Sequence, residues 1–339
     1  MKKYILFFVF ISIFLSVNNF GEKKQKFAEL GDFQLGNSEI IQDLKIGYRT
    51  FGELNSDSSN VILFPTWFGG VSEHLANLIG ENKLVDSSKY YVIAVDAIGN
   101  GVSTSPSNSA HQKNNFPNFT LEDIVKSQKT MLDSLGFKHL YGIIGGSMGG
   151  MQVFQWIVNY PNYINKAVSY TGTPKFTSYD LLYWQTRKEM IEYLQEADVP
   201  EEEIYDFVTK MTYIAIQTPE FRARETSPKE YEEFISSFKN SSKGFNSYDR
   251  KYLIGAMLAQ DVSKKFNGSM EKAAEAVEAE VLIIASMRDH LVNPNPSLEF
   301  ADLINAETLI LYNDCGHLAP GCEMKKVIKR VQDFFNKTE

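Results

Sequence analysis

A serine between glycines is the residue best placed to do chemistry in this chain of 339 residues. The segment GGSMG at residues 145–149 puts glycines two positions before and two positions after Ser147. At a sharp turn from a strand into a helix, side chains at those two positions would collide, so glycines leave the serine hydroxyl exposed. An apolar run precedes the segment and the helix-like MQVFQWIVNYP follows it. The pattern predicts a nucleophilic serine, and the alternative is a tight structural turn.

A serine hydroxyl is a poor nucleophile until a base takes its proton. The chain has five histidines, and only His317, in LYNDCGHLAP, follows a buried apolar run after the serine. A histidine base needs a carboxylate that holds its tautomer and stabilises its protonated form. Asp289 in VLIIASMRDHLVNP meets that need just after another apolar run. His290 is a rival base that we expect to point elsewhere, and Asp314 is a rival acid that we expect to shape the loop.

Acyl transfer also needs hydrogen-bond donors for the oxyanion of the tetrahedral intermediate. We expect one donor to be the backbone N–H of Met148, directly after the nucleophile. The other should come from the loop FPTWFGG at residues 64–70, and we assign it to the backbone N–H of Trp67. The indole of Trp67 could instead form a pocket wall or simply pack.

Several short apolar segments must position these groups. They are β-branched or aromatic, and Gly, Pro, Asp or Asn closes each, which is typical of buried strands. They lie at residues 60–66, 90–96, 140–146, 166–172, 280–286 and 307–313. Between them lie amphipathic stretches such as residues 120–136, where we expect Thr120 to cap a helix that ends at Gly136. This alternation predicts an α/β fold with a mostly parallel sheet that has helices on both faces.

Residues 175–262 interrupt that alternation. They are helix-like, rich in Tyr and Glu, and carry no signal for a buried strand. We interpret them as a helical cap inserted into a core domain formed by residues 30–174 and 263–339. The natural place for such a cap is over the carboxyl ends of the strands, where open α/β sheets bind ligands.

The first 20 residues have a different character. Two lysines precede an apolar run at residues 4–17, which fits a secretory signal. The run is shorter than the roughly 20 residues that span a bilayer, and no A-x-A cleavage site follows it. We expect a signal peptide or an N-terminal anchor and an exported protein, periplasmic or secreted, that meets the membrane only if the segment stays uncleaved. A buried first helix is the alternative.

Composition and cysteine content exclude several other classes. The net charge is −8 and no long basic run is present, which argues against nucleic acid as a partner. Cys315 and Cys322 are the only cysteines, too few for a four-ligand zinc site. In an oxidising compartment they could form a local disulfide, and the alternative is two free thiols. We expect no bound metal or cofactor and a small acyl compound as the substrate.

Four segments of the chain form a recognisable series: IGYRTFGELN (46–55), VDAIGNGVSTSPSN (95–108), GGSMGGMQ (145–152) and AMLAQDV (256–262). They resemble, in the same order, recurring segments of the homoserine O-acetyltransferase family within the α/β-hydrolase superfamily. The resemblance covers roughly residues 30–335. It implies an eight-stranded sheet with a helical cap and an acyl-enzyme formed on Ser147. The chain order Ser147, Asp289, His317 is also the superfamily's order of nucleophile, acid and histidine.

The acceptor of the acyl group is the open question. Family members that acylate homoserine usually carry an Asp directly after the catalytic histidine, and this chain has Leu318 there. Export would place the protein where acetyl-CoA is normally absent, and residues 175–262 hold 16 acidic and 11 basic residues, with no positive excess for CoA phosphates. These features favour hydrolysis of a small ester. The alternatives are an O-acyltransferase that uses acetyl-CoA as co-substrate and a non-catalytic binding protein on the same fold.

Overall fold

The computed structural model describes residues 24–111, 113–237 and 245–337. The expected signal or anchor at residues 1–20 lies outside these ranges. Within them, no helix combines the length and the apolar character that crossing a bilayer requires.

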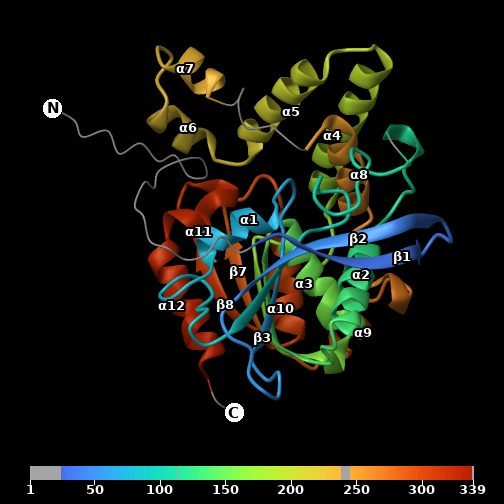
Figure 1. Ribbon diagram of the computed structural model, residues 1–339. Helices are drawn as coiled ribbons and strands as arrows, with labels where there is room; N and C mark the ends of the chain where they lie inside the picture. Colours follow the sequence, from blue (N-terminus) through green and yellow to red (C-terminus); the bar gives the residue numbers. More distant parts are fainter. Residues whose placement is uncertain (1–23, 112, 238–244, 338–339) are drawn as a thin grey trace.

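The described residues form one eight-stranded sheet with the order β1-β2-β4-β3-β5-β6-β7-β8 (Figure 1). Strands β3 to β8 are parallel to one another, whereas β2 is antiparallel to both β1 and β4. The strand bounds are β1 (Lys26–Gln34), β2 (Ile40–Phe51), β3 (Val61–Pro65), β4 (Tyr91–Val95), β5 (Leu140–Gly146), β6 (Ile164–Tyr170), β7 (Glu280–Ser286) and β8 (Glu307–Leu311). The predicted α/β fold with a mostly parallel sheet is confirmed.

The predicted and observed strands differ in the ends of two strands and in two strands that were not predicted. All six predicted strands are present, although β6 begins two residues earlier than expected and β8 ends two residues earlier. The periodicity did not reveal β1 and β2, which only the family resemblance implied. Most side chains of β1 are at least partly exposed, so this edge strand lacks the continuous apolar run that marked the buried parallel strands.

Helices cover both faces of the sheet. The core helices are α1 (Ser72–Leu75), α2 (Leu121–Ser134), α3 (Met148–Asn159), α9 (Met270–Glu275), α10 (Asn295–Leu303), α11 (Ala319–Cys322) and α12 (Met324–Phe335). Along β3, Leu63 belongs to the hydrophobic cluster that contains α2, α3 and α10, while Ile62 and Phe64 belong to the cluster that contains α1 and α12. Because side chains alternate along a strand, two apolar cores hold the sheet between them.

Local signals set the ends of α2 as predicted. The Thr120 side chain accepts a hydrogen bond from the N–H of Asp123, and the Asp123 carboxylate accepts one from the N–H of Thr120. Gly136 follows the helix with φ of 87°, a left-handed conformation that glycine adopts without strain.

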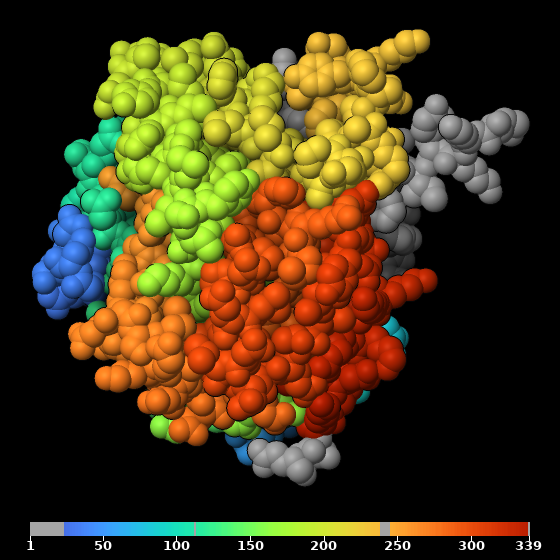
Figure 2. Space-filling model, turned by 180° about the vertical axis from the view of Figure 1, so that it is seen from behind, coloured from blue at the N-terminus to red at the C-terminus, as the bar shows by residue number. Residues whose placement is uncertain are grey.

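Helices α4 to α8, which lie between β6 and α9 in the chain, stand above the sheet (Figure 1). Their bounds are α4 (Ser178–Glu196), α5 (Glu201–Ala215), α6 (Pro219–Glu225), α7 (Tyr231–Ser236) and α8 (Ser247–Leu258). Figure 2 shows α4 to α7, in yellow-green and yellow, resting on the orange and red C-terminal part of the chain. Leu253 and Ile254 of α8 belong to the same apolar cluster as α2 and α3. The helices above the sheet therefore share a core with it.

Single turns of 3-10 helix connect the larger elements. They are η1 (Ala76–Leu78), η2 (Lys113–Asn115), η3 (Pro161–Tyr163), η4 (Lys264–Phe266) and η5 (Gly316–Leu318).

Candidate active site

Ser147 stands alone between the last residue of β5 and the first residue of α3. Its backbone has φ of 55° and ψ of −123°, a conformation that costs free energy for any residue with a Cβ. The Ser147 N–H donates to the carbonyl of Tyr170, and the Ser147 carbonyl accepts from the N–H of Met151, both at 2.9 Å. The sheet and the helix thus hold the serine in a strained turn.

The two flanking glycines are needed because backbone lies against them. A Cβ on Gly145 would lie 2.3 Å from the carbonyl oxygen of Gly149, and one on Gly149 would lie 2.7 Å from that of Pro65. Both separations are far below contact distance. The sequence pattern predicted that side chains at these two positions would collide, and the structure shows that the colliding backbone belongs to α3 and to the end of β3.

Three distant side chains converge at this turn. The His317 Nε2 lies 2.9 Å from the Ser147 Oγ, and the His317 Nδ1 lies 2.6 Å from the Asp289 Oδ2. The other oxygen, Asp289 Oδ1, accepts hydrogen bonds from the N–H groups of Leu291 at 2.8 Å and Val292 at 2.9 Å. The side chains of His317 and Asp289 are only 7% and 1% exposed. This geometry lets the carboxylate hold the proton on Nδ1 and leaves Nε2 free to take the serine proton.

The structure separates the two rival residues from this group. His290 is exposed and no hydrogen bond joins its described side chain to Ser147. Asp314 forms an ion pair with Arg224 of α6, whose guanidinium lowers the pKa of the Asp314 carboxyl. Its role is to join the histidine loop to the helices above the sheet.

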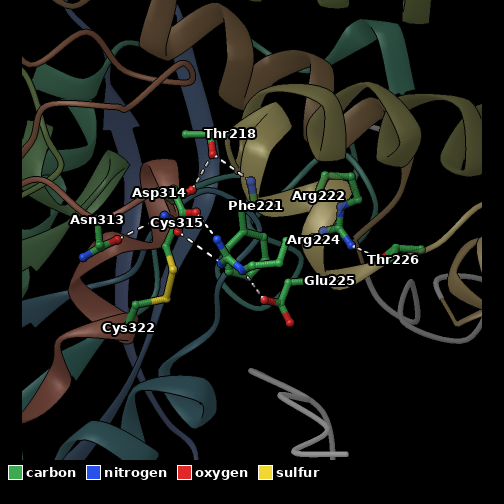
Figure 3. Close-up of polar contacts among 10 residues, drawn as sticks. All are labelled: Thr218, Phe221, Arg222, Arg224, Glu225, Thr226, Asn313, Asp314, Cys315 and Cys322. Atoms are coloured by element: carbon green, nitrogen blue, oxygen red, sulfur yellow. Dashed lines mark hydrogen bonds and ion pairs between the residues drawn. A yellow bond between two sulfur atoms is a disulfide. The ribbon is translucent and has the colours of Figure 1, made fainter.

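The loop that carries His317 is held from two sides (Figure 3). A disulfide joins Cys315 to Cys322. Of the two alternatives that the sequence allowed, bonded or free cysteines, the structure therefore has the bonded one. The Thr218 Oγ1, at the start of α6, donates to the carbonyl of Asp314 at 2.7 Å. The N–H of His317 itself donates to the carbonyl of Ile216 at 2.9 Å. The position of the imidazole therefore depends on residues 216–224 as well as on β8.

The loop that carries Asp289 is held by α4. The Trp184 Nε1 donates to the carbonyl of Leu291 at 3.1 Å. The buried Asp180, which also caps α4, accepts from the N–H of Asn293 at 2.8 Å. The inserted helices thus contact both loops that supply side chains to Ser147.

The two predicted oxyanion donors lie at the start of α3 and in the loop that follows β3. Met148 begins α3 and is fully buried, and Trp67 follows the end of β3 by two residues. The ring of Trp67 stacks on His74, with the two ring centroids 6.3 Å apart, so the indole packs against α1. The Gln152 Nε2 donates to the carbonyl of Thr66 at 3.0 Å and ties this loop to α3.

Two supporting residues escaped the sequence reasoning although they lie in segments that it singled out. Gln152 ends the segment GGSMGGMQ. Asp96 follows β4 and is fully buried, and its carboxylate accepts from the N–H and the hydroxyl of Ser72, both at 2.7 Å. Burial raises the pKa of Asp96. A polar residue at the end of a buried strand was the available signal, because such a group needs partners from neighbouring loops.

Across the residues that the structure describes, no group of three or more His, Cys, Asp and Glu side chains could hold a metal ion.

Comparison with known families decides the classification of the chain. Residues 60–320, which include Ser147, Asp289 and His317, match the family described as the alpha/beta hydrolase fold. The chain belongs to the α/β-hydrolase family. Its eight-stranded sheet and its turn at Ser147 agree with that assignment.

Relatives of this α/β-hydrolase carry two kinds of name. A probable esterase of Corynebacterium glutamicum is 36% identical over 170 residues, which is 49% of either chain. A homoserine O-acetyltransferase of Methanosphaera stadtmanae is 29% identical over 81% of this chain and 64% of its own length. The structure is similar to that of an acetylester hydrolase from Corynebacterium glutamicum, with a TM-score of 0.82 and 26% identity over 93% of this chain and 96% of that one. The matches to the two sequence relatives thus span about half and about two thirds of those proteins.

Proposed function

We propose that this α/β-hydrolase is a serine esterase that hydrolyses a small ester through an acyl-Ser147 intermediate. The observation that carries the proposal is the continuous hydrogen-bond chain from Ser147 through His317 to Asp289. Ser147 Oγ attacks the ester carbonyl while His317 Nε2 takes its proton. The N–H groups of Met148 and Trp67 bind the oxyanion, and the leaving alcohol takes the proton from His317. Water then attacks the acyl-serine with the same base, which releases the acid and restores the serine.

Three features favour water over a second substrate as the acyl acceptor. Leu318 replaces the Asp that follows the catalytic histidine in the family members that acylate homoserine, so no carboxylate at that position could bind an amino group. Residues 175–262 carry no excess of basic residues for the phosphates of CoA. Relatives with hydrolase names include the probable esterase and the acetylester hydrolase. An O-acyltransferase remains the second candidate because of the homoserine O-acetyltransferase relative.

We expect the chain without residues 1–20 to hydrolyse short acyl esters and to release no CoA in a homoserine-dependent reaction. A panel of ethyl and p-nitrophenyl esters with acyl chains of increasing length measures hydrolysis by acid release. Acetyl-CoA with and without homoserine, followed by thiol titration, measures transfer. The Ser147→Ala variant serves as the blank in both assays. CoA release that requires homoserine would instead support the transferase, and failure of a fluorophosphonate to label the wild-type protein would support a binding role.

We also propose that the protein is exported by its N-terminal segment. The lysines and the apolar run of residues 1–20 support this, and so does the disulfide, because cytosolic thiols are normally kept reduced. The expected result is a chain outside the cytoplasm whose cysteines react with a maleimide only after reduction. Alkylation within intact cells before reduction, together with fractionation, makes the measurement. Full alkylation of an unreduced, cytoplasmic pool would contradict export.

A further inference from the structure

A buried chain of side-chain amides leads from the core of the sheet to the loop of Trp67. Gln128 of α2, Gln152 of α3 and the indole of Trp156 are all fully buried. The Trp156 Nε1 donates to the Gln128 Oε1 at 2.9 Å, and the Gln128 Nε2 donates to the Gln152 Oε1 at 2.6 Å. The Gln152 Nε2 then donates to the carbonyls of Thr66 at 3.0 Å and Met148 at 3.1 Å.

Both ends of this chain set its direction. An indole N–H can only donate, so the oxygen of Gln128 must face Trp156. The amide nitrogen of Gln128 then faces the oxygen of Gln152, and the amide nitrogen of Gln152 faces the Thr66 carbonyl, which can only accept. Reversing any one amide would oppose two donors or two acceptors in the buried interior. The network therefore has one arrangement.

The carbonyl at the end of the chain belongs to the peptide unit that carries the N–H of Trp67. The described residues contain no cis peptide bond, and in a planar trans peptide the C=O and N–H groups point in opposite directions. A hydrogen bond that fixes the Thr66 carbonyl therefore fixes the direction of the Trp67 N–H. Thr66 itself is held on its other side, because its N–H donates to the carbonyl of Val95 and its hydroxyl accepts from the N–H of Ala97, both at 3.2 Å.

We propose that Gln152 is a positioning residue that orients the Thr66–Trp67 peptide, and with it the Trp67 N–H, for oxyanion binding. The inference rests on the proposed acyl-transfer function and adds a named residue to it. Donors aimed in advance at the developing oxyanion need no reorganisation during the reaction. The contribution of Gln152 should therefore appear in the transition state rather than in substrate binding.

The chain offers a matched control in the same helix. Gln155 is also buried in α3, and its Nε2 donates to the Gln260 Oε1 at 2.9 Å. None of its hydrogen bonds among the described residues reaches the Thr66 peptide. Gln152→Met and Gln155→Met each remove one buried amide from α3 and replace it with a side chain of similar length. A purely structural role predicts similar effects of the two variants on activity and on melting temperature.

The experiment compares both variants with the wild type in ester hydrolysis and in the rate at which a fluorophosphonate labels Ser147. Removal of one whole oxyanion donor costs about 10²–10³ in kcat, so we expect Gln152→Met, which misaims a donor, to lower kcat and the labelling rate roughly 10- to 100-fold. The KM should change by less than about 3-fold, because the lost interaction acts in the transition state. Gln155→Met should keep kcat and the labelling rate within about 3-fold of the wild type. Equal effects of the two variants would overturn the inference.

A second variant and the comparison of labelling with hydrolysis separate the role of Gln152 from protein folding and from the esterase activity. If Gln152→Met does not fold, Trp156→Phe replaces it as the test variant, because it keeps an aromatic ring and removes the N–H that sets the direction of the amides. We expect this variant to lower kcat and to leave KM unchanged. An unchanged kcat would contradict the proposed role of the network. Labelling of Ser147 without ester hydrolysis would reject the proposed esterase, while the labelling rates would still decide the role of Gln152. A wild-type protein that neither hydrolyses esters nor is labelled would overturn both.

Discussion

The Ser147→Ala variant is expected to lose ester hydrolysis by roughly a million-fold in kcat, the scale seen when the nucleophile of a serine triad is removed. Without the hydroxyl no acyl-enzyme forms, although His317 and the oxyanion donors remain. Alanine keeps the Cβ, so the strained backbone at φ of 55° is not changed, and the melting temperature should stay close to that of the wild type. Steady-state hydrolysis and the mass of the acylated protein, trapped with a slowly hydrolysed ester, measure the effect.

The buried Ser169 gives the control for this variant. The Ser169 hydroxyl, on β6, donates to the carbonyl of Gly150 at 3.2 Å. Among the described residues, it forms no hydrogen bond with His317 or Asp289. Ser169→Ala should keep the rate within about 10-fold, since loss of one buried hydrogen bond affects mainly stability. Near-normal turnover by Ser147→Ala would show that another group is the nucleophile.

The second large effect is expected for Asp289→Asn, with a fall of about 10⁴-fold in kcat. The N–H groups of Leu291 and Val292 require an acceptor at the position of Oδ1, so the amide nitrogen of Asn would face His317. The imidazole would then have to accept at Nδ1 and carry its proton on Nε2, where it faces Ser147. That tautomer cannot take the serine proton. Measurement of kcat together with the melting temperature separates this effect from unfolding.

Asp314→Asn is the matched control for the acid. It keeps the shape of the side chain and removes the charge that pairs with Arg224. We expect a rate within about 10-fold of the wild type, since this ion pair is far less buried than the pair of His317 and Asp289. A larger loss of kcat in Asp314→Asn than in Asp289→Asn would reassign the acid.

The local signals in the sequence were sufficient for the turn and its flanking elements. Gly145 and Gly149 marked a place where backbone approaches backbone, and Thr120 with Gly136 marked the ends of α2. The six parallel strands were also predictable, because each is a short and largely apolar run, as is typical of parallel strands. Strands β1 and β2, the antiparallel pair at one end of the sheet, carry weaker patterns, and the periodicity did not reveal them.

The contacts that hold the loops around Ser147, His317 and Asp289 could not be predicted in the same way. The amide of Gln152 meets the Thr66 carbonyl 86 residues earlier in the chain, and Arg224 meets Asp314 90 residues later. Neither pairing leaves a local pattern, since each depends on how a loop at the carboxyl edge of the sheet packs against a helix from a distant part of the chain. The same is true of the disulfide, for which residue types alone allowed either bonded or free cysteines.

The sequence alone determined which residues could act as nucleophile, acid and base, and that a parallel sheet with an inserted helical segment would carry them. Those features depend on residue type, short-range spacing and periodicity, which are properties of the chain itself. The tertiary structure decided that His317 rather than His290 faces Ser147, that Asp289 rather than Asp314 faces His317, and that α4 and α6 hold both loops in place. The imidazole of His317 lies 2.6 Å from the Asp289 carboxylate and 2.9 Å from the Ser147 hydroxyl. These short distances require the packing of segments that lie up to 170 residues apart in the chain.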